Sequence, residues 1–367
     1  MIELVERLAP PGLAEEWDSA GLQFGSRNAE VDAVLVALEV SGEVLREAIA
    51  RKAGMVVCHH PPLFRPLRRL LEDEPEGALA RDIVRSGLTV YAAHSSLDAS
   101  PQGVNTALAE VLGLRDHVPL GGAAALEGFK LVTFLPPEHL GAASEALFRA
   151  GAGVIGDYEG CSFRTEGVGT FLPGPGSRPF CGEKGRWSEV REVRLEVWVE
   201  GPCLERAVRE LMAVHPYEEP AIDIYPARSP RRGGTGRIGD LPRAMRLDEL
   251  AGLCRRRLAC PAVRFAGAAE ARVRRVAVCG GRGGDRAGEA RRMGADVLVT
   301  GDVSHHEALA ALGAGLAVID AGHYHTERVV VPFLARRLAE MADAAGMEIE
   351  VFGSERETCP WQTGGEG

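Results

Sequence analysis

Two adjacent histidines, His59 and His60, point most directly to chemistry in this chain. They follow the apolar run Met55–Cys58 and come directly before two prolines. Neighbouring side chains in an extended segment point to opposite sides, so two consecutive histidines are poorly placed to chelate one ion. They can serve two ions, one each. The pair therefore predicts half of a metal site with two ions.

Histidine and carboxylate residues also gather at two other points, residues 94–98 and residues 320–327. His323 and Glu327 are four residues apart, which places both on one face of a helix that begins near Gly322. A glutamate in that position could bridge two ions. Imidazole and carboxylate ligands suit zinc, iron or manganese, so the identity of the metal stays open. Two such ions, about 3.5 to 4 Å apart, polarise a substrate oxygen and generate hydroxide near neutral pH. Hydrolysis is the predicted chemistry.

For the remaining histidines near these clusters, the sequence leaves more than one role open. His94 is expected either to bind metal or to support Asp98 from behind, because metal ligands usually need a hydrogen-bonding partner. For His305, His306 and His325, a role as acid or base and a solvated surface position are equally compatible with the sequence.

Short strands must position these clusters. Apolar, β-branched runs predict strands at residues 34–40, 55–58, 89–92, 273–279, 296–300 and 317–319. Helical periodicity between them predicts helices at residues 41–52, 75–86, 247–258 and 285–293. The alternation indicates an α/β fold whose sheet is flanked by helices. Every candidate cluster directly follows a predicted strand, and ligands of open α/β sheets bind beyond the carboxyl ends of strands.

The middle of the chain has a different pattern. Strands are predicted at residues 130–134, 190–199 and 221–225, with helices at 138–150 and 202–214. This order is typical of a ferredoxin-like α+β sandwich. We therefore predict a discontinuous α/β domain, residues 1–125 and 232–367, interrupted by an inserted domain, residues 126–231.

Glycines at residues 280–284 follow the predicted strand 273–279. Their backbone N–H groups could face an anion, with Arg282 adding charge. The segment lacks the Gly-Lys-Ser/Thr ending of a nucleotide-binding loop, and a tight turn from strand to helix explains it equally well.

Composition narrows the class of protein. The chain has 367 residues, 46% of them hydrophobic, and a net charge of −10, which argues against a nucleic-acid-binding surface. It has neither a signal peptide nor an apolar run of the roughly 18 residues that cross a membrane, so a cytoplasmic protein without membrane contact is expected. The eight cysteines are scattered without a Cys-x-x-Cys pair, which predicts reduced structural thiols.

Several motifs together resemble one known family, the GTP cyclohydrolase 1 type 2 homologues, also described as Nif-three-like proteins with a dinuclear metal centre. The motifs are Trp-Asp-Ser-Ala-Gly-Leu-Gln at 17–23, His-His-Pro-Pro-Leu-Phe at 59–64, His-Ser-Ser-Leu-Asp at 94–98, Gly-Val-Asn at 103–105, Thr-Gly-Asp at 300–302 and Gly-His-Tyr-His-Thr-Glu at 322–327. The segment His-Pro-Tyr-Glu-Glu-Pro at 215–220 is similar to the PII-like or CutA-like insert of longer bacterial members.

The resemblance implies two divalent metal ions per chain, held by His59, His60, Asp98, His323 and Glu327. One ion would take His59 and Asp98, the other would take His60 and His323, and Glu327 would bridge them. The resemblance also implies a homohexameric ring.

Two positions depart from the family pattern. Glu39 stands where aspartate is common, and His325 stands where a residue that binds no metal is usual. His325 could therefore add a ligand or disturb the usual arrangement, and both His94 and His325 are candidates for positions behind the ligands.

Two functions are compatible with this site. The first is a metal-dependent hydrolase of the GTP cyclohydrolase 1 type 2 kind, acting on a nucleotide or another small molecule. The alternative is a non-enzymatic metal-binding or regulatory scaffold, because PII-like domains often serve assembly or ligand sensing.

Overall fold

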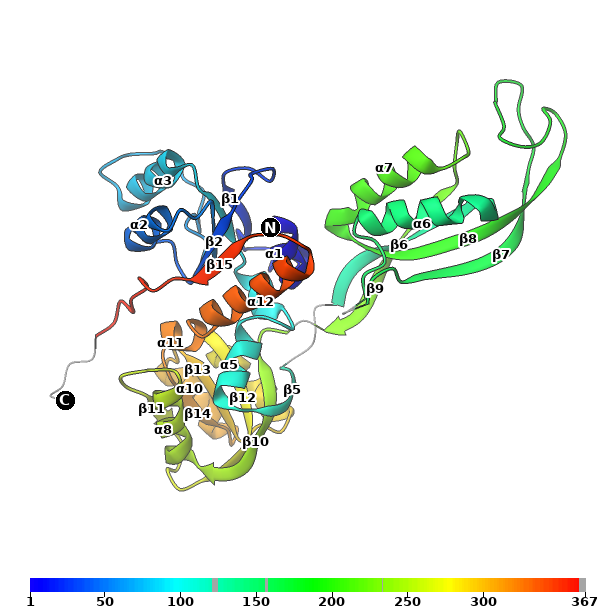
Figure 1. Ribbon diagram of the computed structural model, residues 1–367. Coiled ribbons are helices and arrows are strands. Elements are labelled where there is room, and N and C mark those ends of the chain that lie inside the picture. Colours follow the sequence, from blue (N-terminus) through cyan, green and yellow to red (C-terminus); the bar gives the residue numbers. More distant parts are fainter. Residues whose placement is uncertain (121–124, 156–157, 233, 363–367) are drawn as a thin grey trace. The chain divides into compact units, whose positions relative to one another are not determined.

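The computed structural model describes residues 1–120, 125–155, 158–232 and 234–362. The chain divides into two compact units, which are coloured along the sequence in Figure 1. Residues 1–124 and 232–367 form one unit, called the outer unit below, and residues 125–231 form the other, called the insert.

The first sheet of the outer unit has the strand order β1-β4-β3-β2-β15. Its strands are β1 (Gly21–Phe24), β2 (Ala33–Ala37), β3 (Met55–Cys58), β4 (Thr89–Ala92) and β15 (Glu350–Gly353). All of them run parallel except β1, which pairs antiparallel with β4. Strands β2, β3 and β4 are buried along their whole length, which explains their continuous apolar sequence.

Helices cover both faces of this sheet. Val34 and Val36 of β2 share one hydrophobic cluster with residues of helices α1 and α12, and Leu35 shares another with residues of α2 and α3. These helices are α1 (Ile2–Leu8), α2 (Gly42–Ala50), α3 (Pro75–Ser86) and α12 (Val330–Ala344). Local sequence fixes two of them. The Ser41 side chain caps α2, and α3 begins at Pro75 and ends at left-handed Gly87.

The second sheet of the outer unit has the order β11-β14-β13-β12-β10-β5. Its strands are β5 (Arg115–Pro119), β10 (Arg237–Arg246), β11 (Arg264–Ala266), β12 (Arg272–Arg282), β13 (Val297–Gly301) and β14 (Ala317–Asp320). The central strands β12, β13 and β14 are parallel.

Helices also cover both faces of the second sheet. Residues of α5 (Val104–Leu112) and α8 (Leu247–Arg257) share one cluster with Val278. Residues of α9 (Ala287–Arg292) and α10 (His305–Gly313) share the opposite cluster with Ala277. The short helices α4 (Ser95–Ala99) and α11 (His323–Glu327) follow β4 and β14. Single 3-10 turns lie at η1 (Pro11–Leu13) and η4 (Gly284–Arg286).

The insert has the element order β6 (Ala125–Leu135), η2 (Pro137–His139), α6 (Leu140–Arg149), β7 (Ser162–Phe171), β8 (Ser188–Glu200), η3 (Gly201–Cys203), α7 (Leu204–Val214) and β9 (Ile222–Arg232). Its sheet has the order β7-β8-β6-β9. Residues of α6 and α7 form a core with one face of this sheet, and both helices lie on that side in Figure 1. The PII-like or CutA-like identity of the insert stays a prediction.

The predicted fold class, α/β with helices flanking the sheet, is confirmed. The sequence suggested one such sheet, whereas the outer unit contains two. The predicted strands at 55–58 and 89–92 and the helix at 75–86 have the predicted bounds. All eight cysteines are free, and Cys58 and Cys279 are buried.

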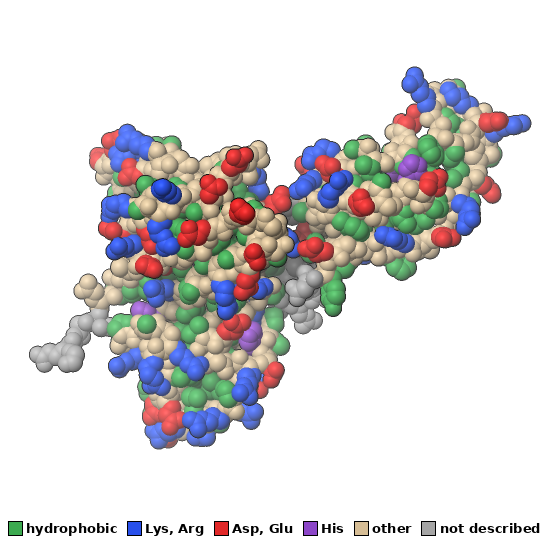
Figure 2. All heavy atoms as spheres, viewed as in Figure 1, with side chains coloured by type: hydrophobic (Ala, Val, Ile, Leu, Met, Phe, Trp, Pro, Cys, Tyr) green, Lys and Arg blue, Asp and Glu red, His purple; other side chains and the backbone are tan. Residues whose placement is uncertain are grey.

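The surface carries charges of both signs, with an excess of acidic residues in the sequence. On the face shown in Figure 2, acidic and basic side chains are interspersed over the outer unit. Among the described residues, no helix is both long enough and apolar enough to cross a bilayer.

Candidate metal centre

The candidate ligands come from the carboxyl edges of both sheets of the outer unit. His59 and His60 directly follow β3 of the first sheet, and Asp98 lies on α4 after β4. His323 and Glu327 lie on α11, directly after β14 of the second sheet. The structure brings all five side chains together at this junction.

Glu327 lies at the centre of the cluster. Its Oε2 is 3.1 Å from Nε2 of His60 and 3.1 Å from Nε2 of His323. Its Oε1 is 3.8 Å from Nε2 of His59, which in turn is 3.7 Å from Oδ1 of Asp98. Glu327 is only 4% exposed, although it lies between histidines from both sheets.

Three atoms of the cluster are buried without satisfying partners. Nε2 of His59, Oδ1 of Asp98 and Oε2 of Glu327 have no hydrogen bond within the described part of the chain. A buried polar atom without a partner costs roughly 1–3 kcal/mol. Because all three are donor atoms that divalent cations prefer, the residues present fit metal ions.

Four imidazoles are held from behind in the same way. The Nδ1 atom of each lies near a carbonyl or carboxylate oxygen, which accepts a hydrogen bond, so Nδ1 carries a hydrogen and Nε2 is the nitrogen that faces the cluster. The pairs are His59 with the Ala93 carbonyl (3.4 Å), His60 with Glu39 (3.3 Å), His94 with Asp18 (2.8 Å) and His323 with Asp302 (2.8 Å). This arrangement is typical of histidines that bind metal through Nε2.

His94 lies closer to the ligands than its sequence position alone indicated. Its ring centroid is 5.2 Å from that of His59 and 5.5 Å from that of His60. These three histidines offer ligand atoms within 4.8 Å of one another, as do His60, His323 and Glu327. Asp18, which supports His94, also accepts a hydrogen bond from the backbone N–H of Ser95.

Glycine at position 281 makes room for the central carboxylate. Gly281 has φ of +62°, and a Cβ there would collide with Oε1 of Glu327. Its N–H donates to Oγ1 of Thr326, and the N–H of Gly280 donates to Oδ1 of Asn105. These two N–H groups are therefore occupied within the protein, which favours the structural explanation of the glycine-rich segment over an anion site.

Asn105 joins the two sheets at the cluster. Its side-chain amide donates to the carbonyl of Asp98 (2.9 Å), on the side of the first sheet, while its Oδ1 accepts from Gly280 (2.8 Å) at the end of β12. Asn105 is 1% exposed. A single buried amide thus fixes the spacing between the segments that carry the ligands.

Charges within the cluster shift pKa values. Burial disfavours the charged form of His60, but contacts with Glu327 and Glu39 outweigh burial and raise its pKa to about 10. The contact with Glu327 raises the pKa of His323 to about 9. Burial raises the pKa of Asp98 to about 6. Burial opposes ionisation of Glu327 too, but the surrounding histidines hold its pKa well below the usual value.

Two exposed aromatic side chains border the cluster. Trp17 is 63% exposed and Phe64 is 52% exposed, and their ring centroids are 6.2 Å apart. Both rings meet His94 edge-on, at centroid distances of 5.9 and 6.0 Å. The cluster therefore has an apolar, aromatic border.

Comparison with known proteins decides the family. Residues 1–360 match the family described as Duf34/NIF3 (NGG1p interacting factor 3). The chain belongs to the Duf34/NIF3 family. It is 39% identical to the GTP cyclohydrolase 1 type 2 homolog of Bacillus subtilis over 362 residues, which cover 98% of this chain and 97% of that protein. Identity and coverage are the same for the homolog from Halalkalibacterium halodurans.

Solved NIF3 structures have the same fold. A Bacillus cereus protein related to NIF3 is 37% identical, with a TM-score of 0.82 and coverage of 99% of this chain and 97% of that one. A Staphylococcus aureus protein is 30% identical, with a TM-score of 0.72 and the same coverage. The resemblance drawn from the sequence motifs is therefore confirmed.

The structure places the other predicted residues of this NIF3 chain as follows. His94 joins the cluster, whereas His325 lies outside both groups of candidate ligands and packs edge-on against Tyr324 at 5.2 Å. His305 and His306 are exposed at the start of α10.

Sequence reasoning did not assign roles to the residues that support the ligands. They are Asp18, Glu39, Asn105, Gly281 and Asp302. Among them, Asp302 had the clearest sequence signal of a site residue, because it directly follows β13 at the carboxyl edge of the sheet. It also has a φ of +53°, which aspartate tolerates better than most residues.

Proposed function

We propose that this chain binds two divalent metal ions and is a metal-dependent hydrolase. The ligands are His59, His60, Asp98, His323 and Glu327. The observation that carries the proposal is the set of imidazoles held at Nδ1, whose Nε2 atoms surround a buried carboxylate. The ions fit zinc, iron or manganese, because histidine and carboxylate ligands suit all three.

Bound divalent ions would supply Lewis acidity and lower the pKa of a coordinated water. The residues of the chain do the rest. Oε2 of Glu327 lies 3.1 Å from Nε2 of His60 and 3.1 Å from Nε2 of His323, so one carboxylate contacts histidines that follow strands of both sheets. His94 donates from Nδ1 to Asp18, which leaves its Nε2 to accept a proton from a substrate.

The relatives suggest which substrate to test. GTP cyclohydrolase 1 type 2 homologs suggest ring-opening hydrolysis of a guanine nucleotide. Trp17 and Phe64 offer exposed aromatic surface beside the cluster, on which a planar base can stack. GTP is therefore the first substrate to assay, followed by phosphoesters and cyclic amides.

Metal content is tested first. Protein purified without added metal is analysed by elemental mass spectrometry beside His60→Ala, and about two ions per chain are expected for the wild type. The exposed His305→Ala is the matched control and should keep the wild-type metal content. Fewer than about one ion per wild-type chain contradicts the two-metal proposal.

Activity is tested separately, with protein loaded with each metal. Hydrolysis should be lost in Glu327→Ala and retained in His305→Ala. Two bound ions without turnover above Glu327→Ala on any substrate would reject the hydrolase and favour the metal-binding scaffold. In that case, a partner captured by the wild type and lost after deletion of residues 126–231 would support the scaffold.

A further inference from the structure

The insert contains a cavity of about 750 Å³. It lies where the hairpin of β7 and β8 continues past the end of β6. The last pair between β6 and β8 is Leu135 with Val193, whereas β7 and β8 remain paired as far as Phe171 and Ser188. Residues 172–181 and 217–221 contribute the other walls. A cavity of this size matches sites for small molecules, which measure roughly 300–1,000 Å³.

The walls of the cavity are joined to each other. The backbone N–H of Arg178 donates to Oε1 of Glu218 at 2.7 Å, and the rings of Phe180 and Tyr217 have centroids 6.0 Å apart. The N–H of Gly185 also donates to the carbonyl of Pro173, which closes the loop between β7 and β8. These contacts hold the cavity open within one chain.

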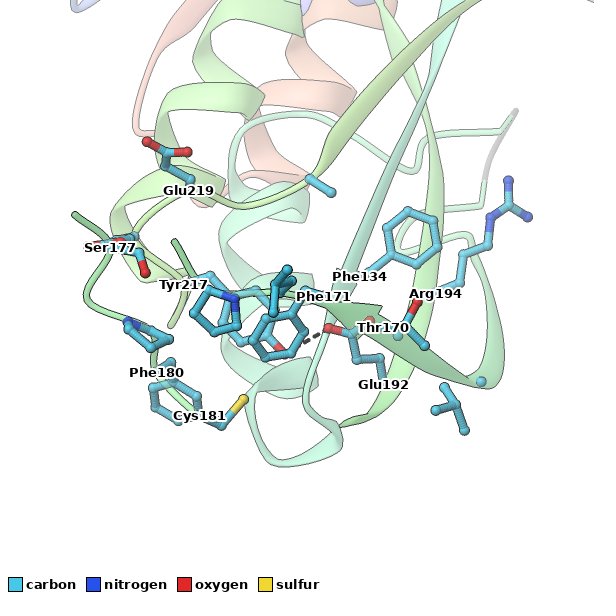
Figure 3. Close-up of a pocket in the computed structure, with 18 of the residues that line it drawn as sticks. Phe134, Thr170, Phe171, Ser177, Phe180, Cys181, Glu192, Arg194, Tyr217 and Glu219 are labelled. Atoms are coloured by element: carbon cyan, nitrogen blue, oxygen red, sulfur yellow. Dashed lines mark hydrogen bonds between the residues drawn. The ribbon is translucent and has the colours of Figure 1, made fainter. Parts of the chain in front are cut away.

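Aromatic rings form much of the lining. Phe134, Phe171, Phe180 and Tyr217 all line the cavity, and they are drawn in Figure 3. The face of an aromatic ring carries negative electrostatic potential and attracts organic cations. The lining therefore offers both apolar surface and favourable sites for positive charge.

Glu192 places a fixed carboxylate in this cavity. Its Oε1 accepts a hydrogen bond from the Tyr217 hydroxyl at 2.7 Å, the dashed line in Figure 3. Position 169 must be glycine for this arrangement, because a Cβ there would collide with Oε2 of Glu192. The tyrosine and the glycine together hold the carboxylate across the β7 strand.

The neighbouring arginines are engaged elsewhere. Arg191 pairs with Glu166 at 3.3 Å, and Arg194 pairs with Glu196 at 3.0 Å. In Figure 3, the Arg194 guanidinium points away from Glu192. Within the described part of the insert, no basic side chain forms an ion pair with Glu192.

The charge of the lining favours one class of ligand. Four carboxylates line the cavity against one guanidinium, and they belong to Glu166, Glu192, Glu218 and Glu219. Phosphate-bearing and carboxylate ligands are repelled by this arrangement. A ligand with a positive nitrogen and an apolar body gains an ion pair and contact with the rings.

We propose that this cavity binds a small organic cation, an amine or ammonium group on an apolar body, with the charged nitrogen at Glu192 and the body among the aromatic rings.

Three probes with a similar ring and different charge test the proposal on the full-length protein. They are benzyltrimethylammonium, benzyl alcohol and phenylacetate, and binding is followed by saturation-transfer NMR and titration calorimetry. We expect the cation to bind at least about tenfold more tightly than the alcohol, and phenylacetate to bind least. Glu192→Gln should remove this preference, whereas Glu189→Gln, at an exposed position on the same strand, should keep it.

A second pair of variants tests the position of the carboxylate while its charge is kept. Gly169→Ala displaces Glu192, so it should weaken cation binding at least about tenfold. Gly141→Ala in α6 is the control, because a Cβ at that position meets no atom within 4 Å and Gly141 does not line the cavity. Melting temperatures are measured for all four variants, and Glu192→Gln and Gly169→Ala are compared only as folded proteins.

The outcomes are distinct. The proposal is overturned if the cation does not bind at millimolar concentration, if the three probes bind equally, or if folded Glu192→Gln binds the cation as well as Glu189→Gln does. Loss in Glu192→Gln together with retention in Glu189→Gln supports it.

Discussion

The three candidate histidine ligands are each held by one group behind the ring. Asp302 contacts Nδ1 of His323 at 2.8 Å and so fixes which ring nitrogen faces the cluster. Removing such a supporting residue typically lowers metal affinity about 10- to 100-fold. We therefore predict this loss for Asp302→Ala, measured by competition with a fluorescent chelator. Asp343→Ala, at an exposed position near the end of α12, should bind metal as the wild type does.

Proton release should accompany metal binding. In the folded chain freed of metal, the pKa of His60 is about 10 and that of His323 is about 9. Their protonated forms therefore stabilise the metal-free fold fully below pH 6.5, and this stabilisation is lost as pH rises through 9 to 10. Metal must displace these protons, so affinity should fall as pH falls.

Calorimetry at pH 8 in buffers of different ionisation enthalpy measures this release. About two protons per chain are expected for the wild type. Fewer are expected for Glu39→Gln, because that variant loses the carboxylate that helps to raise the pKa of His60. Equal heats in all buffers would show that the histidines bind metal without losing protons.

At the scale of elements, a β-strand and a helix meet so closely at the site that position 281 requires glycine. Gly281 lies near the end of β12, and Glu327 ends α11. Gly281→Ala should destabilise the fold by about 1–3 kcal/mol and reduce metal content, because the new methyl group collides with the carboxylate in a left-handed backbone.

Chemical denaturation and elemental analysis measure the two effects. Gly288→Ala is the matched control within α9, where a Cβ meets only the end of Arg292 at 3.8 Å. That change should leave metal content unaltered and stabilise the helix by up to about 1 kcal/mol. Similar behaviour of the two variants would refute the close approach at position 281.

Asn105 gives a second test of how the two sheets are joined. Asn105→Ala removes both hydrogen bonds that connect Asp98 to Gly280, and it leaves a partly buried carbonyl and a partly buried N–H without partners. We expect a loss of about 1–3 kcal/mol in the free energy of unfolding. Asn28→Ala, in an exposed loop, should change stability by less than about 0.5 kcal/mol. Denaturation curves that coincide for the two variants would contradict this role.

Helices and strands with clear periodicity or apolar runs could be predicted from the sequence. The helix at 75–86 could be predicted from its helical periodicity, and β3 and β4 from apolar runs that the fold buries along their whole length. Strand β7 was not assigned, because most of its residues are exposed and Gly167 and Gly169 interrupt its pattern. Helix α12 was not assigned either, since it begins with two valines and a proline, which are poor helix formers.

Local sequence signals also explain which candidate site residues could be predicted. The five candidate ligands follow strands within recognisable motifs, so sequence alone could select them. The pairing of each supporting residue with its histidine could not be predicted in this way, because Asp18 lies 76 residues from His94 and Asp302 lies 21 residues from His323. Only the folded sheets bring these pairs together.

At the scale of the whole molecule, the insert has large apolar side chains on its surface. Tyr158, Phe163 and Trp187 are 75%, 62% and 77% exposed, and hydrophobic side chains come to the surface of the insert in Figure 2. We propose that exposed apolar side chains such as Phe163 serve contacts between copies, because the family resemblance implies a homohexamer.

Light scattering coupled to size exclusion tests this assembly. A mass six times that of the 39.2 kDa chain is expected for the wild type. Phe163→Glu should lower the mass, because burial of the new charge is unfavourable. Ile49→Glu, at a position of the outer unit that is 53% exposed, is the control and should keep the wild-type mass. A wild-type monomer would refute the hexamer.

The candidate ligands come from segments that precede and follow the insert in the sequence, and this order has a consequence for biosynthesis. His59, His60 and Asp98 leave the ribosome long before His323 and Glu327, because the whole insert and the strands of the second sheet are made in between. At roughly 5–20 residues per second, this interval is on the order of ten seconds or more. During translation the early histidines lack the carboxylate that lies at the centre of the cluster. The complete set of candidate ligands therefore forms only after α11 has been synthesised, so the proposed metal loading is a late event in the maturation of the protein.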